Sequence, residues 1–227
     1  MKNKFLIAEY IIAVLFLSLP PITAIFSVQN AETENSISIS SIFQTLTFLL
    51  IAIMMEIQYR KLSKAEEKKD SSVNNLIYKI ARGTLSFGFL MLVQALISLA
   101  AMLIKNFTGV SIAKTFSFTC KGPLQWIWTI FSFLAMAFYE EEFYRQFLPD
   151  LLSFVQPLKK GLNLFLEAIA IVLFALAHAY QGLAAVFNAL FCALILRSCR
   201  KKTGSIWTGF IIHALYNIVI FLFALAL

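Results

Sequence analysis

Long apolar stretches separated by short polar segments recur along the whole chain. Their lengths approach or exceed the roughly 18–20 residues that a helix needs to cross a hydrocarbon core. The stretches are too long and too continuous for the alternating strands of a membrane barrel. The pattern therefore predicts an all-α fold, a polytopic transmembrane bundle of about seven helices, near residues 5–26, 38–58, 84–104, 123–148, 162–180, 183–197 and 205–226.

The first apolar run allows two interpretations. Lys2 and Lys4 precede it, as in a secretory signal, but the run continues from Phe5 through Pro20 and Pro21 without a clear cleavage site. We therefore favour an uncleaved first span over a signal peptide. We predict a single membrane domain over residues 1–227, in which 1–119 supply the amino-terminal helices and 120–227 carry the chemistry.

Composition and charge agree with a membrane protein, since 60% of the residues are hydrophobic and only 14% are charged. Cytoplasmic loops are enriched in lysine and arginine. If the amino terminus is cytoplasmic, only Lys105, Lys114 and Lys121 of the 19 basic residues fall outside. The inner side then holds the loop at 60–82 and a cluster at 197–202, which we interpret as loop residues. Topology and anionic lipid thus account for the net charge of +7 without a nucleic-acid partner.

The cysteines Cys120, Cys192 and Cys199 have no C-x-x-C spacing, so neither a disulfide framework nor a zinc knuckle is predicted. The sequence also contains no phosphate-binding glycine loop, nucleophile elbow or H-E-x-x-H motif. Several classes of enzyme are thereby excluded.

The candidate chemistry lies inside the apolar segments. The chain has two histidines, His178 and His213, and both lie there, as does the acidic run 140–142 that precedes Arg145. An ionisable side chain in a bilayer costs roughly 2.5–3.5 kcal/mol on insertion scales, so such residues usually mark a functional pathway. The simpler alternative is that the acidic run ends a helix at the interface and that each histidine bonds a neighbouring carbonyl.

Helix geometry assigns different roles to these residues. Side chains four apart share a helix face, so Glu141 is expected to pair with Arg145, while Glu140 points elsewhere and can accept a proton. The same spacing relates Phe174 to His178 and His213 to Asn217. Together these groups predict an active site inside the membrane.

The chain at this point resembles the CPBP family, which contains the type II CAAX prenyl endopeptidases and the related bacteriocin-processing and self-immunity membrane proteins. The family's E-E-x-x-x-R resembles 140–145, its F-x-x-x-H resembles 174–178, and its H-x-x-x-N resembles 213–217. The resemblance covers roughly residues 120–225, about half of the chain, and the order and spacing of the three motifs make the combination specific.

The resemblance implies an intramembrane endopeptidase in which Glu140 takes a proton from water and His178 holds that water. Asn217 and His213 would stabilise the oxyanion. Glu141, Arg145 and Phe174 would support the site. This mechanism needs no cofactor. The alternative places zinc between His178, His213 and Glu140, and the sequence leaves both mechanisms open.

Depth in the bilayer adds a further prediction. If helix five began at Lys160, His178 would lie about 27 Å from the inner surface at 1.5 Å per residue, too deep to meet His213. A membrane segment that begins near Glu167 places His178 and His213 at the same depth in the bilayer. The helix from 183 to 197 is also short, so we predict a re-entrant hairpin that turns at Ala179–Gly182, with a cavity that opens to the cytoplasm.

Two other functions stay open. One is a non-catalytic membrane scaffold or regulator of the bacteriocin-immunity type. The other is a proton-coupled transporter, although the chain lacks the paired broken helices that many transporters have. The favoured substrate is a membrane-associated peptide or protein. The short loops and small size favour a bacterial plasma membrane.

Overall fold

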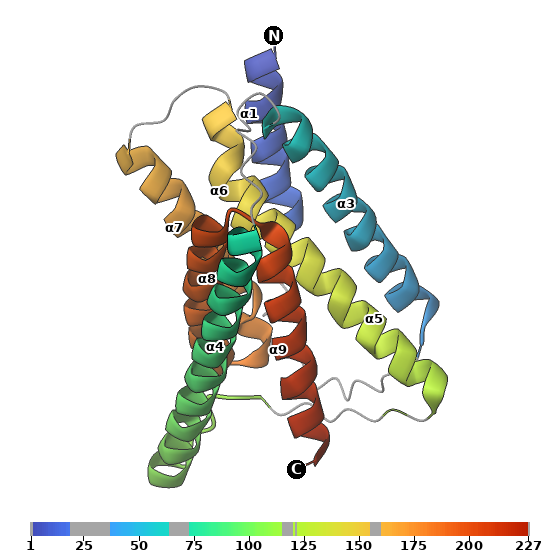
Figure 1. Cartoon of the computed structure of the whole chain (residues 1–227). Coiled ribbons are helices and arrows are strands. Elements are labelled where there is room, and N and C mark those ends of the chain that lie inside the picture. Colours follow the sequence, from blue (N-terminus) through green and yellow to red (C-terminus); the bar gives the residue numbers. More distant parts are fainter. Residues whose placement is uncertain are drawn as a thin grey trace. The chain divides into compact units, whose positions relative to one another are not determined.

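A computed structural model describes residues 2–18, 37–63, 73–114, 120, 122–154 and 160–226 (Figure 1). Those residues form helices joined by short turns. The predicted all-α fold is confirmed. The elements are α1 (Lys2–Ala13), η1 (Val14–Ser18), α3 (Ile39–Ser63), α4 (Val73–Thr108), α5 (Pro123–Glu140), η3 (Glu141–Phe147), α6 (Leu148–Asp150), η4 (Leu151–Phe154), α7 (Lys160–Ala177), η5 (Ala179–Gln181), α8 (Leu183–Thr203) and α9 (Ile206–Ala226).

Local sequence signals set several helix ends. Ser38 and Ser41 cap the start of α3 reciprocally, because each backbone N–H donates to the other's hydroxyl, at 3.2 and 3.0 Å. Pro123 stands in the first turn of α5, where its missing N–H costs no hydrogen bond. Gly204 ends α8 with a φ of 63°, and its N–H donates to the Arg200 carbonyl.

Five helical segments of the described residues are long and apolar enough to cross a membrane, namely Ile39–Ser63, Leu76–Thr108, Lys160–Gln181, Leu183–Thr203 and Ile206–Leu225. The segment Phe5–Ser18 is a shorter apolar helix. The protein is therefore an integral membrane protein. Residues 19–26 of the predicted first span lie outside the described residues. The same holds for five of the lysines on which the predicted topology depends, namely Lys64, Lys68, Lys69, Lys121 and Lys159.

Three helices are clearly longer than their apolar stretches predicted. α3 ends at Ser63 rather than at 58, α4 begins at Val73 rather than at 84, and α8 continues past Arg197 to Thr203. Lysine and arginine are good helix formers, so a helix continues through polar residues beyond the apolar stretch. Arg197 and Arg200 are thus buried helix residues, and the interpretation of the whole 197–202 cluster as a loop was wrong.

The turn predicted at Ala179–Gly182 is confirmed, since the short helix η5 and Gly182 connect α7 to α8. The prediction that the following helix is short was wrong, however, because α8 is 21 residues long and apolar enough to cross a membrane. The depth of this hairpin in the bilayer stays a prediction.

The predicted helix over 123–148 changes its form at the acidic run. α-Helical hydrogen bonding ends at Glu140, and Glu141–Phe147 follow as the π-helical segment η3. In a π-helix the backbone bonds join residues five apart, and such segments are frequent at functional sites. The motif carboxylates therefore lie where one helical geometry gives way to another.

The chain divides into two compact units whose segments alternate along the sequence. Unit 1 comprises Met1–Ala31, Gly88–Thr115 and Tyr144–Ser198, and unit 2 comprises Glu32–Phe87, Phe116–Phe143 and Cys199–Leu227. Each unit takes residues from both sides of the predicted division at residue 120. The single membrane domain stays a prediction.

In unit 2, α5 contacts both α3 and α9. Aromatic rings join α5 to α9: Phe138 stacks on Trp207 at 5.6 Å and meets Phe210 at 5.5 Å, while Phe133 meets Phe221 at 5.2 Å. These contacts run in opposite directions along the two helices, so α5 and α9 are antiparallel. In unit 1, α7 contacts α6, η1 and η5.

Candidate active site

His213 lies between two carboxylates in unit 2. Its Nδ1 is 2.9 Å from Glu141 Oε1, and its Nε2 is 3.4 Å from Glu140 Oε2. The glutamates come from the junction of α5 and η3, and the histidine comes from the second turn of α9. The antiparallel contact of α5 with α9 brings these distant residues together.

The two glutamates differ in exposure. The side chain of Glu141 is fully buried, that of His213 is 6% exposed, and that of Glu140 is 16% exposed. The two ring nitrogens of His213 face different carboxylates, with Glu141 at the shorter distance and Glu140 at the longer one. Glu141 thus orients the histidine, and Glu140 is the carboxylate that a reactant can reach.

Gly209, one turn before His213 on α9, makes room for the buried carboxylate. A Cβ atom at this position would be 2.6 Å from Glu141 Oε2. Any side chain there would displace the carboxylate from His213. The close approach of η3 to α9 thus depends on glycine at this position.

His178 lies in unit 1, at the end of α7. Its Nδ1 is 2.9 Å from the Phe174 carbonyl oxygen, and its ring centroid is 4.6 Å from that of Phe174. The Nδ1–H donates to the carbonyl, so Nε2 keeps its lone pair for a proton or another ligand. The predicted proximity of Phe174 and His178 is confirmed.

The guanidinium of Arg145 lies over the ring of the same phenylalanine. Its guanidinium carbon is 3.6 Å from the Phe174 ring centroid, and both side chains are buried. A guanidinium over a ring face is attracted by the quadrupole of the ring, and burial strengthens this attraction. Arg145 and His178 therefore both contact Phe174 in unit 1.

The turn after His178 is held by a segment far away in the sequence. Lys114 N–H donates to the Gln181 carbonyl at 3.0 Å, and Ala184 N–H donates to the Ile112 carbonyl at 2.9 Å. Gly182 has a φ of 100°, and a Cβ there would be 2.8 Å from the Ile112 carbonyl oxygen. The turn therefore needs glycine for its conformation and for space.

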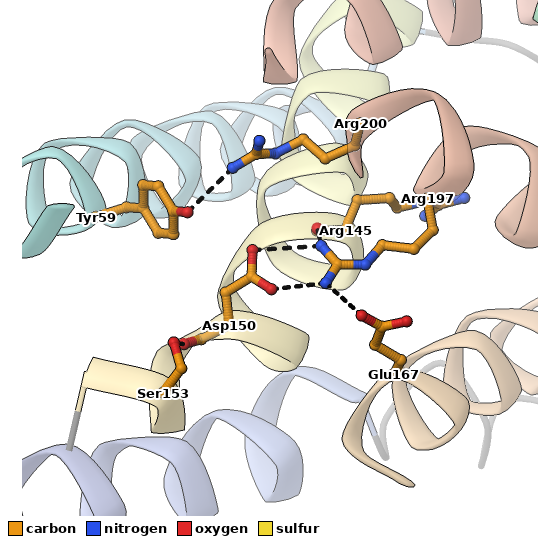
Figure 2. A network of polar contacts seen from close by, with 7 residues as sticks. All are labelled: Tyr59, Arg145, Asp150, Ser153, Glu167, Arg197 and Arg200. Atoms are coloured by element: carbon orange, nitrogen blue, oxygen red, sulfur yellow. Dashed lines mark hydrogen bonds and ion pairs between the residues drawn. The ribbon is translucent and has the colours of Figure 1, made fainter. Parts of the chain in front are cut away.

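Arg197 of α8 forms a buried polar network in unit 1 (Figure 2). Its Nη1 donates to the Arg145 carbonyl at 2.6 Å and to Asp150 at 3.3 Å. Its Nη2 donates to Asp150 at 2.7 Å and to Glu167 at 3.0 Å. The guanidinium thus connects η3, α6, α7 and α8. Arg200, in unit 2, donates to the Tyr59 hydroxyl at 3.2 Å.

Comparison with known protein families gives a match in this region. Residues 122–219 match the model of the family described as type II CAAX prenyl endopeptidase Rce1-like. This result agrees with the CPBP resemblance of the three motifs, all of which lie within the matched residues. No curated protein and no solved structure matches the chain.

The predicted site residues fall into two groups. Glu140, Glu141 and His213 meet in unit 2, and Arg145, Phe174 and His178 meet in unit 1. Asn217 is half-buried on α9, one turn after His213. The assembly of both groups into one active site stays a prediction, as do the individual catalytic roles.

The predicted pairing of Glu141 with Arg145 assumed α-helical geometry, and η3 is π-helical. The premise was wrong, and the pairing itself stays a prediction. Three features were not predicted from the sequence: the contact of His213 with two glutamates, the space at Gly209 and the buried contacts of Arg197. One signal for Arg197 was present, because Glu167 and Arg197 are opposite charges inside two consecutive apolar stretches.

Zinc was the alternative predicted between His178, His213 and Glu140. Among the residues that the structure describes, no group of three or more histidine, cysteine, aspartate or glutamate side chains is arranged to hold a metal ion. The 3.4 Å between His213 Nε2 and Glu140 Oε2 is nevertheless close to the edge of a tetrahedron with bonds of about 2.0–2.1 Å. This pair therefore fits two of the ligands of a zinc ion.

Proposed function

We propose that this protein is an intramembrane endopeptidase that hydrolyses a peptide bond of a membrane-associated peptide or protein. The observation that carries the proposal is the placement of His213 between the buried Glu141 and the more accessible Glu140, within the residues that match the Rce1-like family model. A histidine oriented by one carboxylate while it faces another is a common arrangement for moving a proton.

In the proposed reaction, Glu140 accepts a proton from water as the water oxygen attacks the scissile carbonyl. His178 holds that water through its free Nε2, because its Nδ1 is engaged by the Phe174 carbonyl. Asn217 donates to the oxyanion that forms. Glu140 then returns the proton to the leaving amine, as a base must become an acid in the second half of a hydrolysis.

Glu141 fixes the orientation of His213 in this mechanism. With Nδ1–H bonded to Glu141, the Nε2 of His213 accepts a hydrogen bond on the side of Glu140. When protonated, the same nitrogen donates to the oxyanion. The alternative retains these residues but adds zinc, held by His178, His213 and Glu140. When bound, a zinc ion would activate the water and polarise the carbonyl.

An apolar groove in unit 2 supports a hydrophobic substrate. It has a volume of about 510 Å³ and lies among side chains of α3, α5 and α9 that include Leu49, Ile53, Phe131, Leu134, Phe138 and Phe210. Phe138 is two residues before Glu140, and Phe210 is three residues before His213. We propose that an apolar part of the substrate binds here. The distribution of lysine and arginine along the sequence favours an active site that opens to the cytoplasm.

Cleavage of a quenched fluorescent peptide library by the detergent-purified protein tests the function. Loss of a general base typically costs about 10²–10⁴-fold, and we expect that loss for Glu140→Gln. His178→Ala should also abolish cleavage. Glu142→Gln is the matched control, because this neighbouring glutamate hydrogen-bonds Glu56, whereas Glu140 and Glu141 are the carboxylates that face His213. We expect the Glu142→Gln protein to keep its activity.

Each outcome has a distinct meaning. Equal cleavage by wild type and Glu140→Gln would reject the peptidase and favour the scaffold. Loss of activity in Glu142→Gln alone would show that the motif register is one residue off. A strong chelator separates the two mechanisms, since it should leave cleavage unchanged if water is activated by glutamate alone.

A further inference from the structure

Arg197 lies in the carboxyl-terminal half of α8, with its side chain 9% exposed. Its guanidinium makes a bidentate contact with Asp150 and single contacts with Glu167 and the Arg145 carbonyl (Figure 2). The planar guanidinium can hold several acceptors in fixed directions, which an ammonium group cannot. One side chain thus fixes the relative positions of three other elements in unit 1.

The Arg145 carbonyl lies near the end of η3, four residues before Pro149, which has no N–H to donate to it. Arg197 Nη1 donates to this carbonyl at 2.6 Å. The backbone at Arg145, the last motif residue of η3, is therefore held by α8.

Two routes lead from Arg197 to His178. Through the Arg145 backbone, it fixes the guanidinium that covers Phe174, whose carbonyl in turn binds His178. Through Glu167, it holds α7 two turns before Phe174. Both routes lie within unit 1 and reach His178 through Phe174.

We propose that Arg197 is a positioning residue that holds the His178 ring in the orientation needed for catalysis. The catalytic part of this inference rests on the proposed endopeptidase function. If the ion pairs of Arg197 only stabilised the fold, conservative replacement of their members would change its stability without affecting His178 more than His213.

The test uses Arg197→Lys in the full-length protein, with Arg200→Lys as the matched control. Arg200 is also a buried arginine of α8, but it donates to the Tyr59 hydroxyl on α3. Diethyl pyrocarbonate modifies unprotonated imidazole, and the chain has two histidines, so peptide mass spectrometry reports the modification rates of His178 and His213 separately.

We expect Arg197→Lys to raise the modification rate of His178 by about threefold or more, as a local loosening would, and to leave that of His213 unchanged. In the cleavage assay we expect kcat to fall by about 10–100-fold with little change in KM, because a small displacement near a reacting group is costly. Arg200→Lys should change neither quantity. Glu167→Gln weakens one contact of Arg197 and should give a smaller effect in the same direction. If Arg197→Lys does not fold, the His178 modification rate of Glu167→Gln tests the proposal.

A folded Arg197→Lys protein with the wild-type modification rate at His178 would overturn the proposal. Faster modification of both histidines, or equal effects of the two lysine variants, would overturn it as well, because these results indicate general loosening. The labelling does not depend on catalysis. If wild type and Glu140→Gln cleave equally, the endopeptidase function fails, and the labelling still decides whether Arg197 positions His178.

Discussion

Replacing Gly209 with alanine tests the geometry of the carboxylate–histidine cluster most directly. The new Cβ would lie 2.6 Å from Glu141 Oε2, whereas ordinary contacts begin at 3.4 Å. The carboxylate must therefore move by roughly 0.8 Å, the difference between these two distances, or the helices must separate. Glu141 is fully buried and bonds His213 at 2.9 Å, so the movement weakens a buried charge-assisted hydrogen bond.

Opposing terms determine the size of the effect. Losing a hydrogen bond to a charged group costs about 1.5–3 kcal/mol, while alanine gains about 1 kcal/mol over glycine in a helix. We expect Gly209→Ala to lower the free energy of unfolding by about 0.5–2 kcal/mol, the difference between these terms. Cleavage should suffer more, by about 10²-fold, because catalysis depends on position at the level of 1 Å.

The assays are thermal unfolding in detergent and peptide cleavage. Gly88→Ala is the matched control, since Gly88 is helical and nothing lies within 4 Å of its added Cβ. It should keep full activity and gain up to about 1 kcal/mol. In a Glu141→Ala background, Gly209→Ala should have no further cost, because the atom it displaces is gone. Wild-type stability and activity of Gly209→Ala, or an unchanged penalty in that background, would refute the reasoning.

Further predictions concern the hairpin turn and the topology. Gly182→Ala should destabilise the protein by about 1–3 kcal/mol through strain and through the 2.8 Å contact with the Ile112 carbonyl. Gly109→Ala has a similar positive φ but open space, so equal melting temperatures of the two variants would refute the steric part. In a cysteine-free background, an impermeant maleimide added to intact cells should label a cysteine at Lys105 and not one at Lys202; the reverse pattern would invert the topology.

The membrane helices and the motifs were accessible from the sequence because both depend on residues close together in the chain. Hydropathy over about 20 residues indicates whether a helix can cross a bilayer. A spacing of four residues predicted that Phe174 lies beside His178, and the structure confirms that contact. Helix ends were less accurate, since charged residues such as Arg197 extend a helix as readily as they occupy a loop.

The sequence by itself determined that this protein is a helical membrane protein whose three motifs resemble those of the CPBP family, because insertion into lipid depends on local composition and helix faces follow a fixed period. Only the tertiary structure decided that His213 faces both Glu140 and Glu141, which adjacent positions on a helix would seem to separate. The two nitrogens of one imidazole reach different side chains, and no local pattern in the sequence encodes which helix supplies those side chains. The tertiary structure likewise placed Arg197 in the interior, because a buried cation is stabilised only by distant acceptors that folding brings together.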